Sequence, residues 1–424
     1  MSKEYQLLII GFGTVGEGVY RTIQSKREKL SAILGREVKV PAILVKERGK
    51  SRELEDHTRV ATSLEEISAG AVDLVVEATP DAETGYPYVT HFLKKGIPVV
   101  TANKELIAKK GEELFKLAEA NDSDLLFEAA VAGGIPLLNT LRHTLKTNNI
   151  EQINGILNGT SNYVLTKMQN EGTSFDAALQ EAQEKGYAEA VPDKDVDGWD
   201  AYYKASILSH WIYGAAPEWE EGAPAGIRSV TVEDLLLAEK ATGKIKHVAS
   251  LKRSGFGIQA SVRPCFIFSD HHLYSVNGVD NGVHIKGSLS GDLLLQGPGA
   301  GQYPTASAVI EDVVNVLQGK NERGIQDRII GSLDDESEPA GEYSFITGSE
   351  GILRHLRVRG IPVIAILHHP SGKHIGAAVK TDDQSLSDLH DSVSESFSVY
   401  PVLGNESEIR QNFQHDGKQN AVSF

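Results

Sequence analysis

The chain has a single cysteine, Cys265, among its 424 residues, so an intrachain disulfide is excluded. Cys265 lies in the apolar run Val262–Phe268, which predicts a buried structural thiol rather than a reactive one. No stretch approaches the roughly 18 apolar residues that a transmembrane helix requires. The opening residues MSKEY lead directly into a short apolar run and lack the features of a secretory signal. We therefore expect a protein of a reducing, cytoplasmic compartment.

Positive charge is also scarce, with 42 lysines and arginines against 58 acidic residues and a net charge of −16. Nucleic-acid binding requires a basic surface that neutralises phosphates, so that class of partner is not expected. An anionic membrane is not expected either. The length suggests two to three domains, at roughly 150 residues per domain.

The first 150 residues alternate short apolar runs with helix-like stretches. The expected strands are Gln6–Ile10, Val38–Val45, Val72–Glu77 and Pro98–Thr101. This alternation predicts βαβ units that form a parallel sheet.

A GxGxxG motif directly follows the first expected strand. Gly11 would form the tight turn, Gly13 would let a pyrophosphate approach the backbone, and Gly16 would let helix pack on strand. Thr14 and Val15 would open the helix whose N-terminus receives the negative charge. The position of the motif favours dinucleotide binding over a plain structural turn.

The residues after the second strand bear on the choice of dinucleotide. Lys46 and Arg48 are placed to hold a 2′-phosphate, which predicts NADP. Glu47 leaves NAD open, because an acidic side chain at this point binds the ribose 2′-hydroxyl. A solvated loop without a role in binding is the third interpretation.

Six stretches are long and unusual in composition. They are GFGTVGEGV (11–19), VVTANKELIA (99–108), FEAAVAGGIPLLNTL (127–141), GILNGTSNYVLTKM (155–168), EAQEKGYAEAVPDKDVDGWDAYYKASIL (181–208) and GPGAGQYPTASAV (297–309). In order and spacing they resemble the homoserine dehydrogenase family, over about residues 5–330. The resemblance implies NAD(P)-dependent interconversion of L-aspartate 4-semialdehyde and L-homoserine, a step in threonine and methionine biosynthesis.

The resemblance assigns catalytic roles to Lys204, Asp200 and Lys104. Lys204 would donate a proton or hydrogen bond to the oxygen of the reacting carbonyl as charge develops there. Asp200 precedes Lys204 by four residues, which places both on one face of a helix. Without the resemblance, an ordinary surface ion pair would be the better interpretation. Lys104 would lie beside the nicotinamide and the carbonyl.

Substrate binding is assigned in the same way. Glu189 would hold the substrate ammonium, Asp195 would line the same site, and Thr160 would supply a hydroxyl. Acidic residues suit an amino-acid substrate, whose ammonium needs a negative partner in a poorly solvated pocket. Val191 replaces an aspartate that is usual in the family, which would alter a helix cap or relax substrate binding.

Further positions match the cofactor and ion sites of the family. Thr79 would contact the nicotinamide ribose, and Gly186 and Gly301 would bring backbone close to the cofactor, although plain turns are an alternative for these glycines. A sodium ion would be held by backbone carbonyls. These belong to Glu128, Val131, Gly133 and Ile135.

No transition-metal motif stands out. The 14 histidines include no HExxH or CxxC arrangement. The pairs His271–His272 and His368–His369 are typical of surface turns and do not indicate ligand pairs.

The expected fold is α/β, with three parts. A Rossmann-like domain covers 1–140 with a return segment at 297–330, and a mixed α+β catalytic and dimerisation domain covers 141–296. A small ACT-like module covers 340–415. The family assembles through its middle domain, so a homodimer or homotetramer is expected.

The ACT-like module departs from its relatives. Its expected segments are Tyr343–Thr347, Gly351–Val358, Pro362–Leu367, Ile375–Val379, helix-like Leu386–Phe397 and Tyr400–Leu403. The Pro-Gly turn that precedes the first helix in relatives is replaced by Gly348–Gly351. Both effector binding and a structural or dimerising tail stay open.

Two other functions stay open at this point. One is a dehydrogenase of the same scaffold for a different amino- or hydroxy-semialdehyde, suggested by Val191 and the altered tail. The other is an NADP-binding sensor without catalysis, which the intact set of Lys104, Glu189, Asp200 and Lys204 disfavours.

Overall fold

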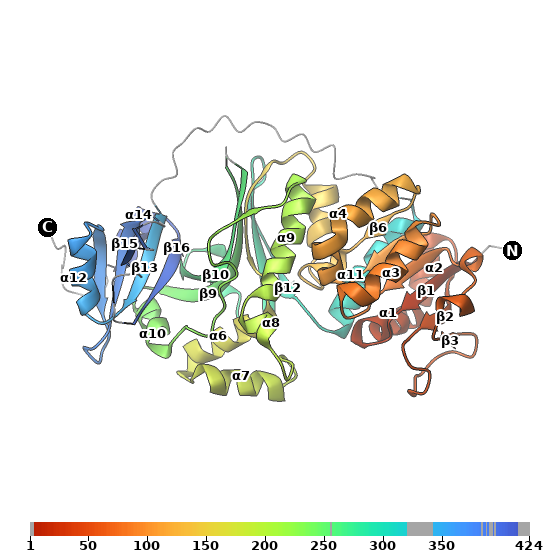
Figure 1. The fold of residues 1–424 in the computed structure, drawn as a ribbon, viewed down its shortest axis with the longest axis horizontal. Coiled ribbons are helices and arrows are strands. Elements are labelled where there is room, and N and C mark those ends of the chain that lie inside the picture. Colours follow the sequence, from red (N-terminus) through yellow and green to blue (C-terminus); the bar gives the residue numbers. More distant parts are fainter. Residues whose placement is uncertain are drawn as a thin grey trace. The chain divides into compact units, whose positions relative to one another are not determined.

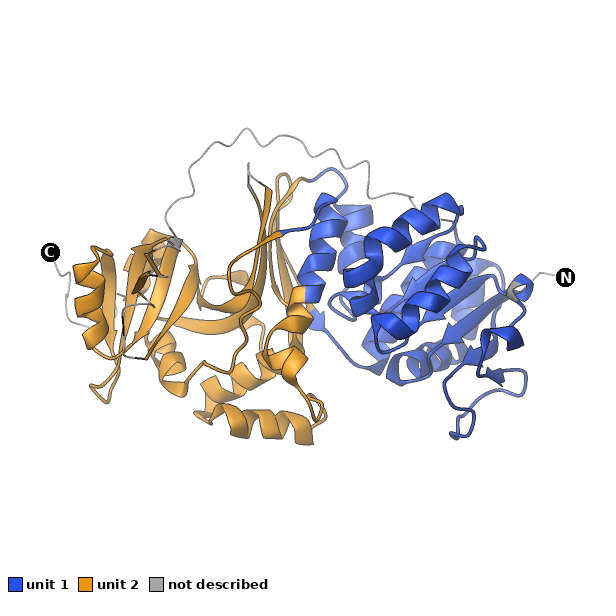
Figure 2. Ribbon diagram, viewed as in Figure 1, with its two compact units in different colours: residues 1–148, 203–217, 297–330 blue, residues 149–202, 218–296, 331–424 orange. Residues whose placement is uncertain are grey.

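The structure is a computed structural model. It describes residues 4–254, 257–319, 342–382 and 396–413, together with Ser385, Leu386, Asp388, Leu389 and Val393. The chain forms two compact units, shown in blue and orange in Figure 2. Unit 1 comprises 1–148, 203–217 and 297–330, and unit 2 comprises the rest.

Unit 1 contains a parallel sheet with the strand order β3-β2-β1-β4-β5-β6. Its strands are β1 (Tyr5–Ile10), β2 (Val38–Leu44), β3 (Arg59–Ala61), β4 (Leu74–Glu77), β5 (Val99–Thr101) and β6 (Leu125–Leu126). The order reverses at β1, which is the switch point where doubly wound sheets bind ligands.

Helices alternate with these strands along the chain (Figure 1). They are α1 (Thr14–Ser25), α2 (Arg27–Leu34), α3 (Ala82–Leu93), α4 (Lys104–Ala120), α5 (Leu137–Asn139) and α11 (Gln302–Leu317), with short η1 (Leu64–Glu66), η2 (Ala69–Ala71), η3 (Glu128–Ala130) and η4 (Thr140–Thr144). Both faces of the sheet are covered, because Leu7 and Ile9 pack with α1 and α11 while Leu8 and Ile10 are buried on the opposite face. This explains the uninterrupted apolar run of β1.

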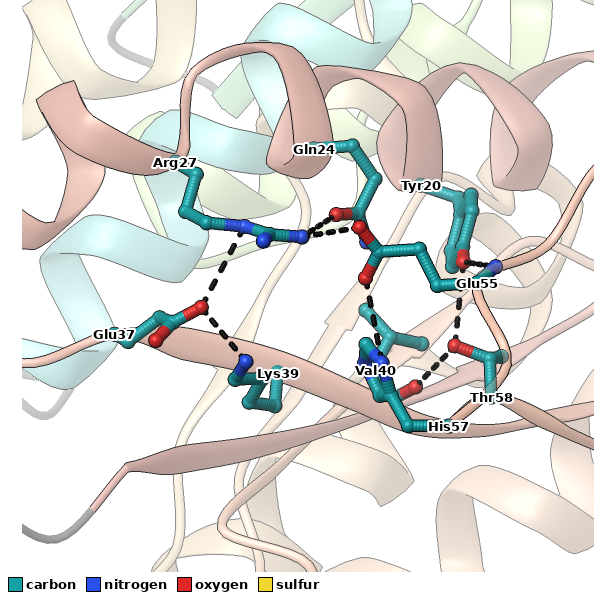
Figure 3. A network of polar contacts seen from close by, with 9 residues as sticks. All are labelled: Tyr20, Gln24, Arg27, Glu37, Lys39, Val40, Glu55, His57 and Thr58. Carbon is teal, nitrogen blue, oxygen red and sulfur yellow. Dashed lines mark hydrogen bonds and ion pairs between the residues drawn. The ribbon is translucent and has the colours of Figure 1, made fainter.

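A polar network fixes the end of the loop between β2 and β3 (Figure 3). The Tyr20 hydroxyl on α1 accepts a hydrogen bond from the Glu55 backbone amide at 2.8 Å and lies 3.2 Å from the Thr58 hydroxyl. Thr58 donates to the carbonyl of Val40 at 2.8 Å. Arg27 pairs with Glu55 in the same network. The loop is therefore tied to α1 and β2 at this end.

Unit 2 is built on a mixed sheet with the order β12-β11-β7-β9-β10-β16-β13-β15-β14, and β8 pairs with β10. The strands are β7 (Ile150–Ile156), β8 (Glu218–Trp219), β9 (Gly243–Ser254), β10 (Gly257–Phe268), β11 (Asp280–Gly287), β12 (Gly291–Pro298), β13 (Glu342–Gly348), β14 (Val363–His368), β15 (Ile375–Thr381) and β16 (Phe397–Leu403). Cys265 on β10 is buried, as expected.

The remaining helices of the described residues are α6 (Gly159–Glu171), α7 (Phe175–Glu184), α8 (Asp193–Val196), α9 (Trp199–Tyr213), α10 (Val232–Lys240), η5 (His272–Ser275), α12 (Gly351–Val358) and α14 (Glu406–Phe413). Among them, α6 and α10 pack against β9, and α12 and α14 pack with the C-terminal strands. Helix α9 begins in unit 2, and from Tyr203 onward its residues belong to unit 1.

The C-terminal strands form the sheet order β16-β13-β15-β14 with antiparallel neighbours. This is the order of a split βαβ fold, which an ACT-like module would have. These strands join the larger sheet, because β16 runs parallel to β10 through the pair Phe266 and Val402. Half of the residues of the expected helix 386–397 lie outside the described residues, and its expected last residue, Phe397, is instead the first residue of β16.

The expected fold class, a Rossmann-like parallel sheet with a mixed α/β part, is confirmed. The boundaries of the two units differ from those of the expected domains in three places. Residues 141–148 and 203–217, expected in the middle domain, group with unit 1, and the C-terminal strands group with unit 2 rather than alone. The physical reason for the difference at α9 is that this helix is continuous, so its residues from Tyr203 onward fall in unit 1. The C-terminal strands group with unit 2 because β16 pairs with β10 and thereby extends the same sheet.

Within the described part of the chain, none of the helices combines the length and hydropathy that crossing a bilayer requires.

Candidate active site

The glycine turn between β1 and α1 leaves room for a ligand at one glycine only. A Cβ on Gly11 (φ +87°) would lie 2.4 Å from the carbonyl oxygen of Ala78, and one on Gly16 would lie 2.1 Å from that of Gly11. At Gly13 no heavy atom lies within 4 Å of that position. Gly13 is also the N-cap of α1 and provides no side-chain cap to the helix amides. The turn therefore fits an anionic group held by the helix N-terminus.

Thr79 lies beside this turn, just after the end of β4. The register pairs Ile10 with Glu77, and the backbone amide of Ala78 donates to the carbonyl of Ile10 at 2.8 Å. The expected cofactor residues Gly11 and Thr79 are therefore neighbours at the switch point, and the Cβ position of Gly11 lies 3.1 Å from the Thr79 nitrogen.

A buried carboxyl group, Glu77, organises the ends of β4 and β5. It accepts hydrogen bonds from the Thr79 amide at 2.7 Å and from the hydroxyls of Thr79 and Thr101. Asn103 donates to Glu77 at 3.5 Å and to the carbonyl of Asp81 at 2.8 Å. Burial raises the pKa of Glu77, and the hydrogen bonds oppose that shift. Sequence reasoning missed this residue, although an acidic end to the apolar strand LVVE was a signal.

Lys104 is the first residue of α4, and the same network holds the start of that helix. The side-chain oxygen of the N-cap residue Asn103 accepts from the backbone amide of Leu106 at 3.0 Å. Asn103 thus links Glu77 to the helix that carries Lys104.

The basic loop after β2 is exposed from Lys46 to Lys50. The Arg48 guanidinium forms an ion pair with Glu66. Arg52 folds back over the loop and donates to the carbonyls of Glu47 at 2.8 Å and Lys50 at 2.9 Å. The loop thus presents cationic groups at the surface, and Arg48 already has an acidic partner.

The residues expected to hold sodium form a tight turn in unit 1. Ala132 and Gly133 both have positive φ, at +58° and +54°. A Cβ on Gly133 would lie 2.3 Å from the carbonyl oxygen of Gly299, and the Gly134 amide donates to the carbonyl of Pro298 at 3.1 Å. The turn from Val131 to Ile135 is therefore packed against the segment that leads to Gly301.

Gly301 itself is the N-cap of α11 and has a φ of +111°. A residue with a side chain would be strained in this backbone conformation. Its position beside the 131–135 turn was not evident from the sequence.

Two buried carboxyl groups, Glu128 and Asp312, lie close to each other next to the residues of the 131–135 turn. The Glu128 side chain accepts from the backbone amides of Leu138 at 2.8 Å and Asn139 at 2.6 Å, while the Glu128 amide donates to Asp312 at 2.7 Å. Burial, followed by the charge of Asp312, raises the pKa of Glu128 to about 8. Burial also raises the pKa of Asp312, to about 6.

In unit 2, Asn158 brings two expected site residues together. Its amide donates to Asp195 at 2.8 Å and to Asp200 at 2.9 Å. Its side-chain oxygen caps α6 by accepting from the Ser161 amide at 2.8 Å. Asn158 is a site residue that sequence reasoning missed, and its position before a helix in LNGTS was the available signal.

Thr160 contacts the loop that carries the expected substrate residues. Its hydroxyl donates to the carbonyl of Tyr187 at 2.6 Å. Glu189 and Val191 in this loop are exposed, and Gly186 has a φ of +74° with open space around its Cβ position. Thr160 therefore lies beside this loop, and Asp195 is hydrogen-bonded to Asn158. Glu189 is exposed, and among the described residues its side chain is not one of the hydrogen-bond partners of Thr160 or Asn158.

Asp200 and Lys204 both lie on α9 and both are buried, with 3% and 8% of their surface exposed. A plain surface ion pair is therefore excluded. Buried charged groups carry a high desolvation cost and are commonly retained for function.

A second buried lysine, Lys246 on β9, lies in unit 2. It donates to Asn162 on α6 at 3.1 Å and to the carbonyl of Val276 at 2.7 Å. Burial, followed by the charge of Lys244, lowers the pKa of Lys246 to about 7. The adjacent His247 is also buried, which lowers its pKa to about 4.

Comparison with known proteins identifies the relatives of this chain. Residues 136–314 match the family model for homoserine dehydrogenase, and residues 11–128 match the NAD-binding domain of homoserine dehydrogenase. A homoserine dehydrogenase from Lactococcus lactis is 41% identical over 322 residues, which covers 74% of either chain. The homoserine dehydrogenase from Bacillus subtilis is 37% identical over 318 residues, with 74% of this chain and 73% of the relative covered.

Solved structures give the same result. A homoserine dehydrogenase from Thiobacillus denitrificans superposes with a TM-score of 0.81 at 30% identity, covering 94% of this chain and 98% of the other. A hyperthermophilic archaeal homoserine dehydrogenase in complex with NADPH superposes with a TM-score of 0.63 at 31% identity, covering 76% and 99%.

Proposed function

The chain belongs to the homoserine dehydrogenase family of NAD(P)-dependent oxidoreductases, and we propose that it interconverts L-aspartate 4-semialdehyde and L-homoserine through Lys204, Asp200 and Lys104. The observation that carries the assignment is the burial of Asp200 and Lys204 on one helix, four residues apart.

Lys204 supplies the proton or hydrogen bond that the carbonyl oxygen requires during reduction, and it accepts that proton in the reverse direction. A bound nicotinamide dinucleotide supplies or accepts the hydride. Because Lys204 is buried, its charge acts on the developing alkoxide in a medium of low dielectric, where such interactions are strong. Asp200 lies one helical turn away and orients the ammonium group. Lys104 binds the substrate oxygen or the cofactor amide from the start of α4.

The substrate ammonium is bound by acidic residues of unit 2, Glu189 and Asp195. Asp195 is held by Asn158 at 2.8 Å, which supports a fixed carboxylate for this role. Thr160 contributes by holding the loop at Tyr187, so that its role is to position the segment that carries Glu189.

We propose NADP as the preferred cofactor. The 2′-phosphate would be bound by Lys46 and Arg48, with Arg48 exchanging its partner Glu66 for the phosphate. The open space at Gly13 and the uncapped start of α1 support binding of the pyrophosphate by Thr14, Val15 and Gly16. Thr79, Gly186 and Gly301 would line the rest of the cofactor.

Cofactor preference is tested with Arg48→Ala. We expect the KM for NADP⁺ to rise by about tenfold, the loss of one charge-assisted contact of about 1.4 kcal/mol, with the KM for NAD⁺ unchanged. The matched control is Arg59→Ala, on the exposed start of β3. Equal effects on both cofactors would reject the 2′-phosphate contact.

A sodium ion is proposed for the carbonyl groups of Glu128, Val131, Gly133 and Ile135. The consecutive positive φ values at Ala132 and Gly133 curl this backbone, which supports convergence of its carbonyl groups. The carbonyls of Glu128 and Ile135 also accept backbone hydrogen bonds, at 3.3 Å and 2.8 Å, so they would bind through their second lone pairs. Turnover measured in sodium and in tetramethylammonium salts tests this site.

The remaining proposals concern assembly and location. A homodimer or homotetramer formed through residues 141–296 is proposed, as is a cytoplasmic location. The split βαβ order of the C-terminal strands supports an ACT-like module at 340–415. Sedimentation of the full chain tests the assembly, with a monomer as the outcome that would reject it.

The dehydrogenase assignment is tested with L-homoserine and NADP⁺, and then NAD⁺, by following the absorbance of the reduced cofactor. We expect Lys204→Ala to lose more than about a hundredfold in kcat while it still binds NADPH. Lys116→Ala, an exposed α4 lysine paired with Glu112, is the matched control. A wild-type chain that binds NADPH without turnover would indicate a different semialdehyde or a sensor.

A further inference from the structure

Three potential metal ligands meet in unit 2, and none of them is among the residues proposed for hydride transfer. They are His272 in η5, His284 on β11 and Asp292 on β12, and one ligand atom from each lies within 4.8 Å of the other two. The His284 Nε2 atom lies 2.8 Å from a carboxylate oxygen of Asp292. The imidazole rings of His272 and His284 have centroids 4.5 Å apart.

The fold explains why these residues meet. Strands β11 and β12 are neighbours in the sheet, so a short hairpin brings Asp292 beside His284. His284 is fixed from the other side, because its backbone pairs with Asn154 on β7. His272 follows β10 and reaches the same point through the η5 turn. The cluster therefore joins three elements that share no local sequence motif.

We propose that His272, His284 and Asp292 bind a divalent transition-metal ion of the zinc class. Imidazole nitrogen and carboxylate oxygen are the usual ligands of such ions. With bonds of about 2.0–2.1 Å, tetrahedral geometry places ligand atoms about 3.4 Å apart. The ligand atoms of the cluster are at most 4.8 Å from one another, so small side-chain rotations reach that arrangement.

A second observation points to a ligand at His284. This side chain is 8% exposed, and its Nδ1 atom is buried without a hydrogen-bond partner among the described residues. Buried polar atoms are normally hydrogen-bonded, and an exception in a native fold is explained by strain, by a catalytic role or by a bound water or ion. Metal binding by one ring nitrogen would be accompanied by a water or ion at the other.

The surroundings suit a metal that keeps an open coordination position. His272 is exposed, and His271, His272 and His284 line an open hollow of about 840 Å³ in unit 2. Three protein ligands leave a fourth position for water or a small anion. Lys286 is a nearby cation, and its charge is balanced by Glu151 on β7 at 3.6 Å. His271 is not needed as a ligand, because its Nδ1 accepts from the Leu273 amide at 3.1 Å.

The test is a zinc titration of the full, untagged chain by calorimetry after treatment with a chelator. We expect one equivalent of zinc per chain, and His272→Ala and Asp292→Asn each weaken binding by more than about tenfold. Both residues are at the surface, so these variants avoid the folding risk of His284→Ala. Circular dichroism verifies that each variant is folded.

His374→Ala is the matched control, because His374 is exposed and lies beside another histidine, His369, with ring centroids 6.3 Å apart. It should bind zinc like the wild type. The proposal is overturned if the wild-type chain binds no zinc, or if His272→Ala and Asp292→Asn bind it as tightly as the control. Dehydrogenase activity does not enter this readout, so the result is independent of the proposed function.

Discussion

The side-chain amide of Asn158 donates a hydrogen bond to the carboxylate of Asp200 at 2.9 Å. The same amide group donates to Asp195 at 2.8 Å. One residue at the N-cap of α6 therefore fixes two carboxylates from separate elements. The position of each carboxylate therefore depends on Asn158 as well as on the helix that carries it.

Asn158→Ser separates the two roles of this residue. Serine still caps a helix, but it is too short to bridge both carboxylates. We expect kcat/KM for homoserine to fall roughly a hundredfold through misplacement of Asp195 and Asp200, with little change in Tm. Ser174→Ala, which removes the cap of α7, is the control and should lower Tm without loss of turnover. Full activity of Asn158→Ser would contradict the positioning role.

Glu77 is expected to position Thr79 and the start of α4. Glu77→Ala leaves the buried donors of Thr79 and Thr101 without an acceptor, at about 1–3 kcal/mol for each buried group. We expect weaker NADPH binding and a lower free energy of unfolding, and a smaller effect for Glu77→Gln, which keeps one oxygen. Fluorescence titration with NADPH and urea unfolding measure the two effects. Wild-type affinity in a folded Glu77→Ala chain would show that the network does not affect the cofactor site. Glu83→Ala, at the exposed start of α3, is the control.

The buried Glu128 predicts that unit 1 loses stability as pH rises. An unfolded Glu128 ionises near 4.5, whereas the folded chain keeps its proton to about 8. The folded state therefore binds more protons in this window, and the free energy of unfolding falls with rising pH by an amount on the order of a few kcal/mol. Glu128→Gln should remove most of that slope in urea unfolding between about pH 5 and pH 9. An unchanged slope would mean that Glu128 ionises normally.

Lys246 predicts the opposite dependence in unit 2. Its pKa falls from 10.5 to about 7, so between these values the unfolded chain binds one more proton than the folded chain. The free energy of unfolding contributed by Lys246 therefore rises as pH increases from 7 to 10.5. Lys246→Met should flatten this rise, and Lys252→Met on the exposed part of β9 should not. Equal slopes in both variants would reject the prediction.

The nucleotide-binding part was predictable from the sequence because its signals are local. The apolar run of β1, the glycine spacing at Gly11, Gly13 and Gly16, and the helix that follows depend on neighbouring residues only. The strand boundaries agree with the expected ones within two residues at β1 and β4, because both faces of this sheet are buried. The family motifs added the residues of the reaction, which no periodicity indicates.

The sequence by itself determined the α/β class, the glycine turn and the identity of the charged residues, because backbone preference and hydrophobic pattern act over short separations. Only the tertiary structure decided which polar groups are buried and paired. Glu128 meets Asp312 across 184 residues, and Lys246 is buried by α6 and the 276–277 turn. Likewise Asn158 meets Asp200, and His272 meets His284, only after the strands are paired. Desolvation and hydrogen bonding depend on these distant neighbours, so they follow from the packed fold and not from the local sequence.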